Sequence, residues 1–279
     1  MKKLHIYICC LIIGILTSCE KYETIDADLS FESKLVVSAL LKEGETDIVV
    51  NVSRTTPLIG TEPRTEMGSI PDALVYLTGP HGELQLVFDS MEMLYKGSLS
   101  GNGIESGATY FIAVSHNGEK VTGSTTVPVQ YETVSTMKWD STMESGFQEY
   151  SAHLSCKNLS QGYPMIMLYP FIVYSDSSRY PMLYGSLSRI RKLAYQQTLE
   201  QQFTSMFTAE FVYPVRVELI TLVYDEAYSS YYNQVFDLTM GGASGNPFAE
   251  PSIVKSNMSN GIGIFGSSKI IGWESFPLN

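Results

Sequence analysis

The sequence predicts a mainly β protein, in which a β-sandwich is followed by a second β-rich domain with one or two helices. Tyrosine is abundant, at 18 of 279 residues, and charged residues make up only 17% of the chain. This composition favours extended strands over helices. From Lys34 onward, short apolar segments are separated by turns that contain Gly, Asn or Pro. Strands of this length and spacing are typical of sandwiches.

The first 18 residues have the organisation of a signal peptide. Lys2 and Lys3 precede the apolar run Leu4–Leu16, which is shorter than the roughly 20 residues that a membrane-spanning helix needs. The run ends in "LTSC", which resembles the processing site of bacterial lipoproteins, where Cys19 would become the lipidated N-terminus. Several acyl chains, at about 0.8 kcal/mol per buried CH₂, would hold the protein on a membrane. An ordinary secretory signal with an incidental cysteine is the alternative.

Cysteine content and charge limit the other possibilities. Once Cys9, Cys10 and Cys19 are assigned to the leader and the anchor, only Cys156 remains, so the body forms no internal disulfide. The net charge is −11 with Lys2 and Lys3 and therefore −13 without them. A chain this acidic is a poor partner for nucleic acid or for anionic lipid headgroups.

Residues 19–32 form a lipidated acidic tether between the signal peptide, residues 1–18, and the fold. Glu20 and Glu23 resemble in part the acidic sorting signal of surface lipoproteins in Bacteroidota. The sequence thus predicts the outer membrane, at the cell surface, with the periplasmic face as the alternative. Behind the tether we expect a β-sandwich domain at residues 33–130 and a β-rich C-terminal domain at residues 131–279.

The first domain shows the clearest turn signals. "KLVVSALL" and "DIVVNVSR" flank "KEGET", which predicts a hairpin with Gly44 in its turn. In the second of these strands, Ile48, Val50 and Val52 recur with the period of two that is typical of a half-buried strand. Asn117 and Gly118 mark the tip of a later hairpin. The expected domain is an immunoglobulin- or transthyretin-like (Ig/transthyretin-like) sandwich.

The second domain is less regular. "PVRVELITLVY" predicts a strand, and "DEAYSSYYNQVFDLTMGG" predicts a helix with Asp225 as its N-cap and Gly241 as its stop. "RKLAYQQTLEQQFTSMF", residues 191–207, has helical character, which gives the second of the two expected helices. The fold of residues 175–210 is the least defined by the sequence.

Near the C-terminus, Gly261, Gly263 and Gly266 form a literal G-x-G-x-x-G. A dinucleotide site needs a strand before the glycines, a helix after them and a distant acidic residue, whereas only 13 residues follow Gly266. We therefore expect these glycines where the backbone bends or another segment packs closely, and we expect no cofactor. No His or Cys spacing predicts a metal site. No pair of carboxylates or nucleophile motif nominates a catalytic residue, so we expect no enzyme activity.

Tyrosines are the better candidates for a binding surface. Five of them recur within a short stretch of the second domain, and tyrosine suits surfaces that bind a partner while remaining wet. Packing in the domain core is the alternative for each of them. The candidate interface residues are Tyr163, Tyr169, Tyr174, Tyr180 and Tyr184.

The segment "NPFAEPSIVKSNMSNGIGIFGSSK", Asn246–Lys269, resembles the C-terminal signature of DUF4249, a family of Bacteroidota lipoproteins without an established activity. "CEKYETIDADL", "KLVVSALLKEGETDIVVNVSRTTPL" and "LITLVYDEAYSSYYNQV" resemble other parts of the family in the same order. The resemblance implies, by gene association, a non-catalytic outer-membrane lipoprotein that is accessory to a TonB-dependent transporter, in ligand capture or capping. The alternatives are a stand-alone surface module that binds glycan or peptide, and a hydrolase.

Overall fold

The computed structural model describes residues 32–56, 68–144, 147–182, 189–207, 213–240 and 254–278. The chain divides into Met1–Glu32 and Ser33–Asn279, and every strand and helix named below belongs to the second unit. The predicted lipidation residue Cys19 lies outside the described residues. Among the described helices, none has the length and apolar character needed to cross a bilayer.

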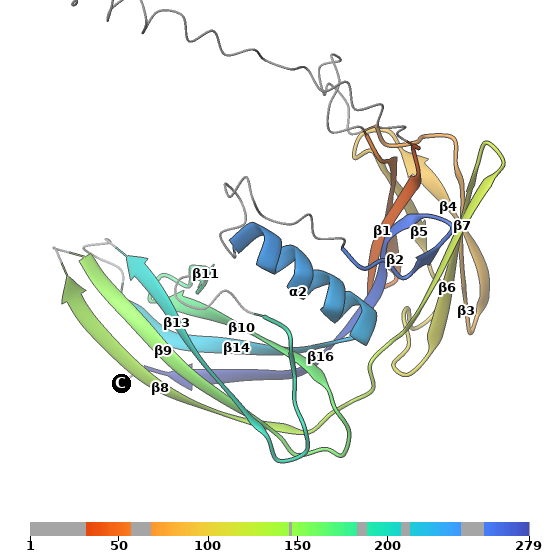
Figure 1. Ribbon diagram of the computed structural model, residues 1–279. Coiled ribbons are helices and arrows are strands. Elements are labelled where there is room, and N and C mark those ends of the chain that lie inside the picture. The colour runs from red at the N-terminus through yellow and green to blue at the C-terminus, as the bar shows by residue number, and fades with distance from the viewer. Residues whose placement is uncertain are drawn as a thin grey trace, which may run out of the picture. The chain divides into compact units, whose positions relative to one another are not determined.

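The N-terminal half of the second unit is a β-sandwich. Its core contains residues from each of the seven strands described in this half. Strand β4 pairs with β5 on one side and with β3 on the other, so one hydrogen-bonded path runs through these strands in the order β1-β2-β5-β4-β3-β6-β7 (Figure 1). Alternating burial along β1 and β2 gives each strand one core face and one solvent face. The strands are β1 Leu35–Lys42, β2 Asp47–Arg54, β3 Leu74–Gly79, β4 Gly82–Asp89, β5 Leu94–Ser98, β6 Thr109–His116 and β7 Glu119–Thr126.

Both predicted hairpins of this half are confirmed. Strands β1 and β2 are antiparallel and joined by a turn in which Gly44 has a φ of 81°. Strands β6 and β7 pair from His116 and Glu119 inward, across a turn in which Asn117 and Gly118 have φ values of 49° and 82°. Two consecutive positive φ angles match the twist of the flanking strands, which explains why Asn-Gly suits this turn.

The described residues of the C-terminal half form strands of two sheets and one helix. The three-stranded sheet β13-β9-β8 lies on one face of β10 and β14, and α2 lies on the other face (Figure 1). Buried side chains of β9 and β13 pack against those of β10 and β14, and Tyr228 of α2 stacks on Tyr224 of β14. The mainly β fold class, with a sandwich first, is thereby confirmed. The elements are β8 Thr133–Glu144, β9 Phe147–Asn158, β10 Met165–Tyr174, β11 Arg179–Pro181, β12 Arg191–Lys192, β13 Thr198–Phe207, β14 Pro214–Tyr224, α2 Glu226–Met240, β15 Met258–Ser259 and β16 Ile262–Pro277.

The helical interpretation of residues 191–207 is wrong, because this segment forms strands β12 and β13. Along β13, Leu199 and Phe203 are buried and Gln201 between them is half-buried, a period of two rather than 3.6. The segment pairs with β9 over ten residue pairs. Glu and Gln carry a helical preference worth only a fraction of a kcal/mol each, so pairing and burial decide the structure.

The predicted helix at residue 226 is confirmed. The amide nitrogen of Tyr228 donates a hydrogen bond of 2.9 Å to Oδ1 of Asp225, which is the N-cap geometry. Residues 241–253, which include the expected stop at Gly241, lie outside the described residues.

Strand β16 belongs to both halves. Residues 262–268 run parallel to β1, and residues 268–277 run antiparallel to β14 (Figure 1). The domain boundary predicted at residue 130 remains a prediction. The last strand of the chain nevertheless adds a strand to the sheet of the first half, so the two predicted domains share hydrogen bonds.

Candidate ligand-binding cleft

An open cleft of about 480 Å³ lies where the two halves meet. This volume falls within the usual range of small-molecule sites, about 300–1,000 Å³. Four separate segments supply its walls: the end of β7 with the residues that follow it, the loop before β10, strand β12, and the start of α2. The lining residues are Ser124, Thr125, Thr126, Val127, Pro128, Val129, Tyr131, Tyr163, Pro164, Met165, Lys192, Val223, Tyr224, Asp225, Glu226 and Ala227.

The cleft combines an aromatic surface with a pair of opposite charges. Tyr163 is 65% exposed. The ammonium group of Lys192 lies 5.6 Å from the centroid of the Tyr163 ring and 3.5 Å from Oε1 of Glu226. An exposed ring offers stacking area, and the ammonium and the carboxylate offer a donor and an acceptor. The arrangement therefore suits a ligand that has both an apolar face and polar groups.

Asp225 links α2 to β16 at the base of the cleft. Besides capping α2 through Oδ1, it accepts a hydrogen bond at Oδ2 from the amide of Ser267 on β16. The hydroxyl of Ser267 lies 2.7 Å from the hydroxyl of Thr125 on β7, and this contact is buried. The first half, the shared strand and the helix are thus held to one another at the base of the cleft.

Behind the base of the cleft, aromatic rings stack along one face of α2. Tyr224, Tyr228 and Tyr232 follow one another at centroid distances of 5.2 and 6.3 Å, and Phe236 follows at 6.4 Å. Burial is the main cause that raises the pKa of Tyr224 well above its usual range, with smaller contributions from Tyr228, Tyr232 and Tyr169. The phenol of Tyr224 therefore stays neutral at physiological pH.

The five predicted interface tyrosines differ in their exposure and in their place in the fold. Tyr163 is exposed and lines the cleft, and Tyr180 is 48% exposed on β11. Tyr169 is half-buried and packs against Phe171. Tyr174 is only 1% exposed because its ring lies in the core of the C-terminal half, so it is not a surface residue. Tyr184 lies outside the described residues.

The sequence did not single out Tyr131, Lys192 or Glu226, which complete the cleft. None of these residues belongs to a local motif that indicates binding, and their segments are brought together by strand pairing between distant parts of the chain. The Tyr163 prediction relied on tyrosine density, which was the only local signal for this surface.

The three glycines of the G-x-G-x-x-G pattern lie at close contacts, as predicted. Gly263 has a φ of 127°, and a Cβ there would collide with the carbonyl oxygen of Val37 on the parallel strand β1. A Cβ on Gly261 would come within 2.6 Å of Val121, and one on Gly266 within 2.6 Å of Tyr228. These positions serve strand packing, because β16 continues past them as a strand to Pro277.

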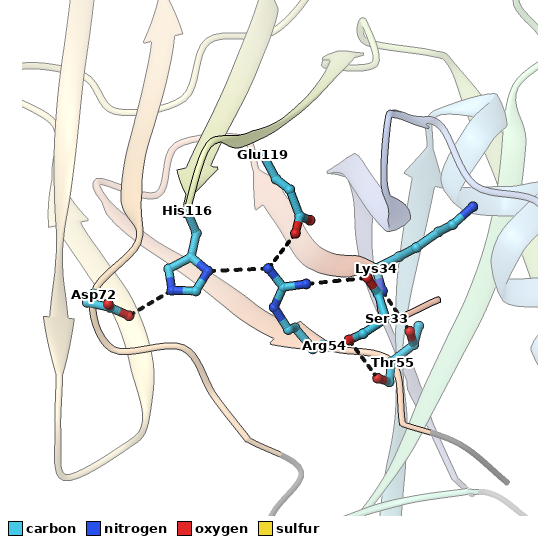
Figure 2. Close-up of polar contacts among 7 residues, drawn as sticks. All are labelled: Ser33, Lys34, Arg54, Thr55, Asp72, His116 and Glu119. Carbon is cyan, nitrogen blue, oxygen red and sulfur yellow. Dashed lines mark hydrogen bonds and ion pairs between the residues drawn. The ribbon is translucent and has the colours of Figure 1, made fainter. Parts of the chain in front are cut away.

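A polar network holds the start of the folded unit (Figure 2). Nη2 of Arg54, at the end of β2, lies 2.7 Å from Oε1 of Glu119 and 3.5 Å from Nδ1 of His116. Because arginine only donates, Nδ1 accepts, and Nε2 of His116 carries the proton that faces Asp72 at 3.1 Å. Nη1 of Arg54 also lies 3.4 Å from the carbonyl oxygen of Ser33.

Two further hydrogen bonds fix the same point. The hydroxyl of Ser33 donates to the carbonyl oxygen of Thr55 at 3.2 Å, and the amide of Lys34 donates to the hydroxyl of Thr55 at 2.9 Å (Figure 2). The chain thus joins the sandwich beside the tip of the β6–β7 hairpin. Nε2 of His81 lies 2.8 Å from Oε1 of Glu105 elsewhere in the first half. Within the described ranges, no group of three or more His, Cys, Asp or Glu is arranged to hold a metal ion.

Residues 21–270 match the family described as a domain of unknown function, DUF4249. The chain belongs to this family. No curated protein matches the DUF4249 chain. Among solved structures, a two-domain fibronectin type III segment from chicken tenascin is similar over 69% of this chain and 91% of that chain, at 13% identity and a TM-score of 0.19. A TM-score this low does not support a structural relationship, so the fold class is assigned from the strand pairing alone.

Proposed function

We propose that this DUF4249 protein is a non-catalytic lipoprotein of the outer membrane of Bacteroidota, accessory to a TonB-dependent transporter in ligand capture or capping. The observation that carries the proposal is "LTSC" at the end of the apolar run, with Cys19 as the lipidated residue. The family match begins at residue 21, directly behind this cysteine. The acidic residues that follow favour the cell surface over the periplasmic face.

Anchoring at Cys19 would keep the folded unit close to its partner. Ser33 is the fourteenth residue after Cys19, so the two lie at most about 50 Å apart along a fully extended chain. Ser33 is bound to Arg54 and Thr55, so the tether would pull on the sandwich at one defined point. A transporter in the same membrane would therefore encounter the protein at a high effective concentration.

Affinity purification of the tagged, lipidated protein from detergent-solubilised membranes, read by mass spectrometry, tests this proposal. A TonB-dependent receptor should be recovered in stoichiometric amount with the wild-type protein and with Cys156→Ala, whose cysteine is buried in the body. Recovery should fall strongly with Cys19→Ala, because the protein leaves the membrane. If no transporter is enriched with any of these forms, the accessory role is rejected.

A stand-alone binding module for glycan or peptide is the second candidate, and the cleft favours it. Tyr163, Lys192 and Glu226 would contact a ligand without help from another protein. This function predicts that the purified protein alone binds a glycan or a peptide, and that Tyr163→Ala weakens binding about tenfold, as expected for a lost aromatic contact. Tyr195→Ala, at a tyrosine that is 48% exposed but does not line the cleft, is the matched control.

A further inference from the structure

A second surface with a distinct chemistry lies on the face of the β10-β14-β16 sheet on which α2 also lies. Glu218 on β14 is held between two arginines: its Oε2 is 3.1 Å from Nε of Arg179, and its Oε1 is 2.9 Å from Nη2 of Arg216. The flanking residues Val217 and Leu219 point into the core. Side chains alternate along a strand, so Glu218 and its arginines lie on the opposite face.

Aromatic rings extend this cluster. The guanidinium carbon of Arg179 lies 3.7 Å from the centroid of the Phe171 ring and 5.0 Å from that of Trp273. Phe171 is the register partner of Glu218, and Trp273 pairs with Ile220 one row away. Trp273 is 58% exposed, and Ile270, farther along β16, is 50% exposed. We call Phe171, Arg179, Arg216, Glu218 and Trp273 the arginine–tryptophan platform.

The platform carries more positive than negative charge, although the whole chain has a net charge of −11. Two guanidinium groups share one carboxylate that is only 12% exposed, while the side chains of Arg179 and Arg216 are 33% and 44% exposed. Two guanidinium groups present about ten N–H donors, and one carboxylate offers about four acceptor positions. The platform can therefore accept further carboxylates.

We propose that the arginine–tryptophan platform binds an acidic peptide segment of a partner protein. Carboxylates of the segment would pair with Arg179 and Arg216, and an apolar side chain beside them would cover Trp273. Exposed Trp and Arg are the residues that contribute most to protein interfaces. None of the platform residues lines the cleft, so the two surfaces are made of different residues.

The proposal is tested with paired synthetic peptides and the complete mature chain in detergent. Each peptide carries Asp or Glu beside an aromatic residue, and its pair has Asn or Gln in their place. The acidic member should bind at least about tenfold more tightly, as expected for a charge-assisted hydrogen bond. The difference should shrink as salt is raised.

Variants of the platform separate recognition from a merely structural role. Arg179→Gln should weaken the acidic peptides about tenfold, whereas Glu218→Gln should strengthen them because it frees the arginines. Trp273→Ala should weaken both members of a pair. Arg191→Gln removes an exposed charge from β12, away from the platform, and should change nothing. Unchanged melting temperatures would show that each variant is folded.

Three results would overturn the proposal. The acidic and amide peptides could bind equally well, or Glu218→Gln could weaken the acidic peptides as much as Arg179→Gln does. The third is binding of carboxylated oligosaccharides, used as a parallel probe, by a platform that binds none of the peptides. In that case the surface would recognise a sugar acid and not a protein.

Discussion

The two halves of the folded unit differ in how far apart in the sequence their paired strands lie. In the first half, β1–β2, β3–β4, β4–β5 and β6–β7 are consecutive pairs, while β2–β5 and β3–β6 are more distant. In the second half, β8–β9 and β10–β11 are consecutive, but β10 also pairs with β14, β9 with β13 and β14 with β16. Turns between consecutive strands leave a local signal such as Asn-Gly, while distant pairing leaves none. The difference explains why the sequence describes the first half well and the second half poorly.

The two halves are nevertheless connected, because strand β16 pairs with strands of both. Its first residues pair with β1 in parallel, and a parallel partner cannot be reached through a tight turn. We therefore expect the halves to unfold together and not as independent domains. Substitutions in both halves test this coupling.

Gly263→Ala should lower the free energy of unfolding by about 5 kcal/mol, the largest loss expected here, or should prevent folding altogether. The new Cβ would meet the carbonyl oxygen of Val37 and would require a φ that alanine rarely adopts. Urea denaturation read by both tryptophan fluorescence and circular dichroism measures the loss.

Gly44→Ala is the control for Gly263→Ala. Gly44 also has a positive φ, of 81°, but no atom lies within 4 Å of its added Cβ, so only the backbone cost of about 1–2 kcal/mol applies. Equal losses for the two variants would show that the β1–β16 contact is not the cause.

Phe203→Ala should cost about 4 kcal/mol, the usual range for a large buried side chain. Phe203 is 1% exposed and lies opposite Ala152 of β9, in the segment whose helical interpretation is wrong. Thermal and urea unfolding measure the loss. Glu200→Ala, at an exposed position of the same strand, should cost less than about 0.5 kcal/mol. A small effect of Phe203→Ala would contradict the pairing of β13 with β9.

Asp225→Ala should cost about 2 kcal/mol, because it removes the N-cap of α2 and leaves the amide of Ser267 without its acceptor. Asp237→Ala, on the same helix, removes only an ion pair with Arg189 that is partly exposed and should cost about 0.5 kcal/mol. Denaturation midpoints of the two variants compare them. If Asp225→Ala lowered the free energy of unfolding as little as Asp237→Ala does, the contacts of Asp225 at the base of the cleft would not couple the halves.

The smallest effect concerns a local turn of the first half. The hydrogen bond from Lys96, with those from the amides of Met91 and Glu92, lowers the pKa of Asp89 below its ordinary value. The stabilisation of the folded state by ionised Asp89 is therefore present above the ordinary pKa of Asp, and it is lost as the pH falls through the lowered pKa. NMR titration should show the pKa of Asp89 rising towards its ordinary value in Lys96→Met. An unchanged pKa would contradict the role of Lys96.

The sequence predicted the fold class, both hairpins of the first half and the capped helix, because each depends on residues close together in the chain. It misassigned residues 191–207, where Leu199 and Phe203 satisfy the helical spacing as well as the strand spacing and only pairing with β9 decides. It also singled out Tyr163, but not the cleft, and lipidation at Cys19 stays a prediction. Lys192 and Glu226 join Tyr163 there from segments that are remote in the chain.

The mass of the mature N-terminal peptide from membranes tests the proposed lipid anchor most directly. We predict a chain that begins at Cys19 and carries acyl groups on this residue, with the protein recovered in the outer-membrane fraction. Cys19→Ala should abolish both the acyl mass and this fractionation, and Cys156→Ala should preserve both. A mature chain that begins elsewhere, or an unmodified Cys19, would contradict the account.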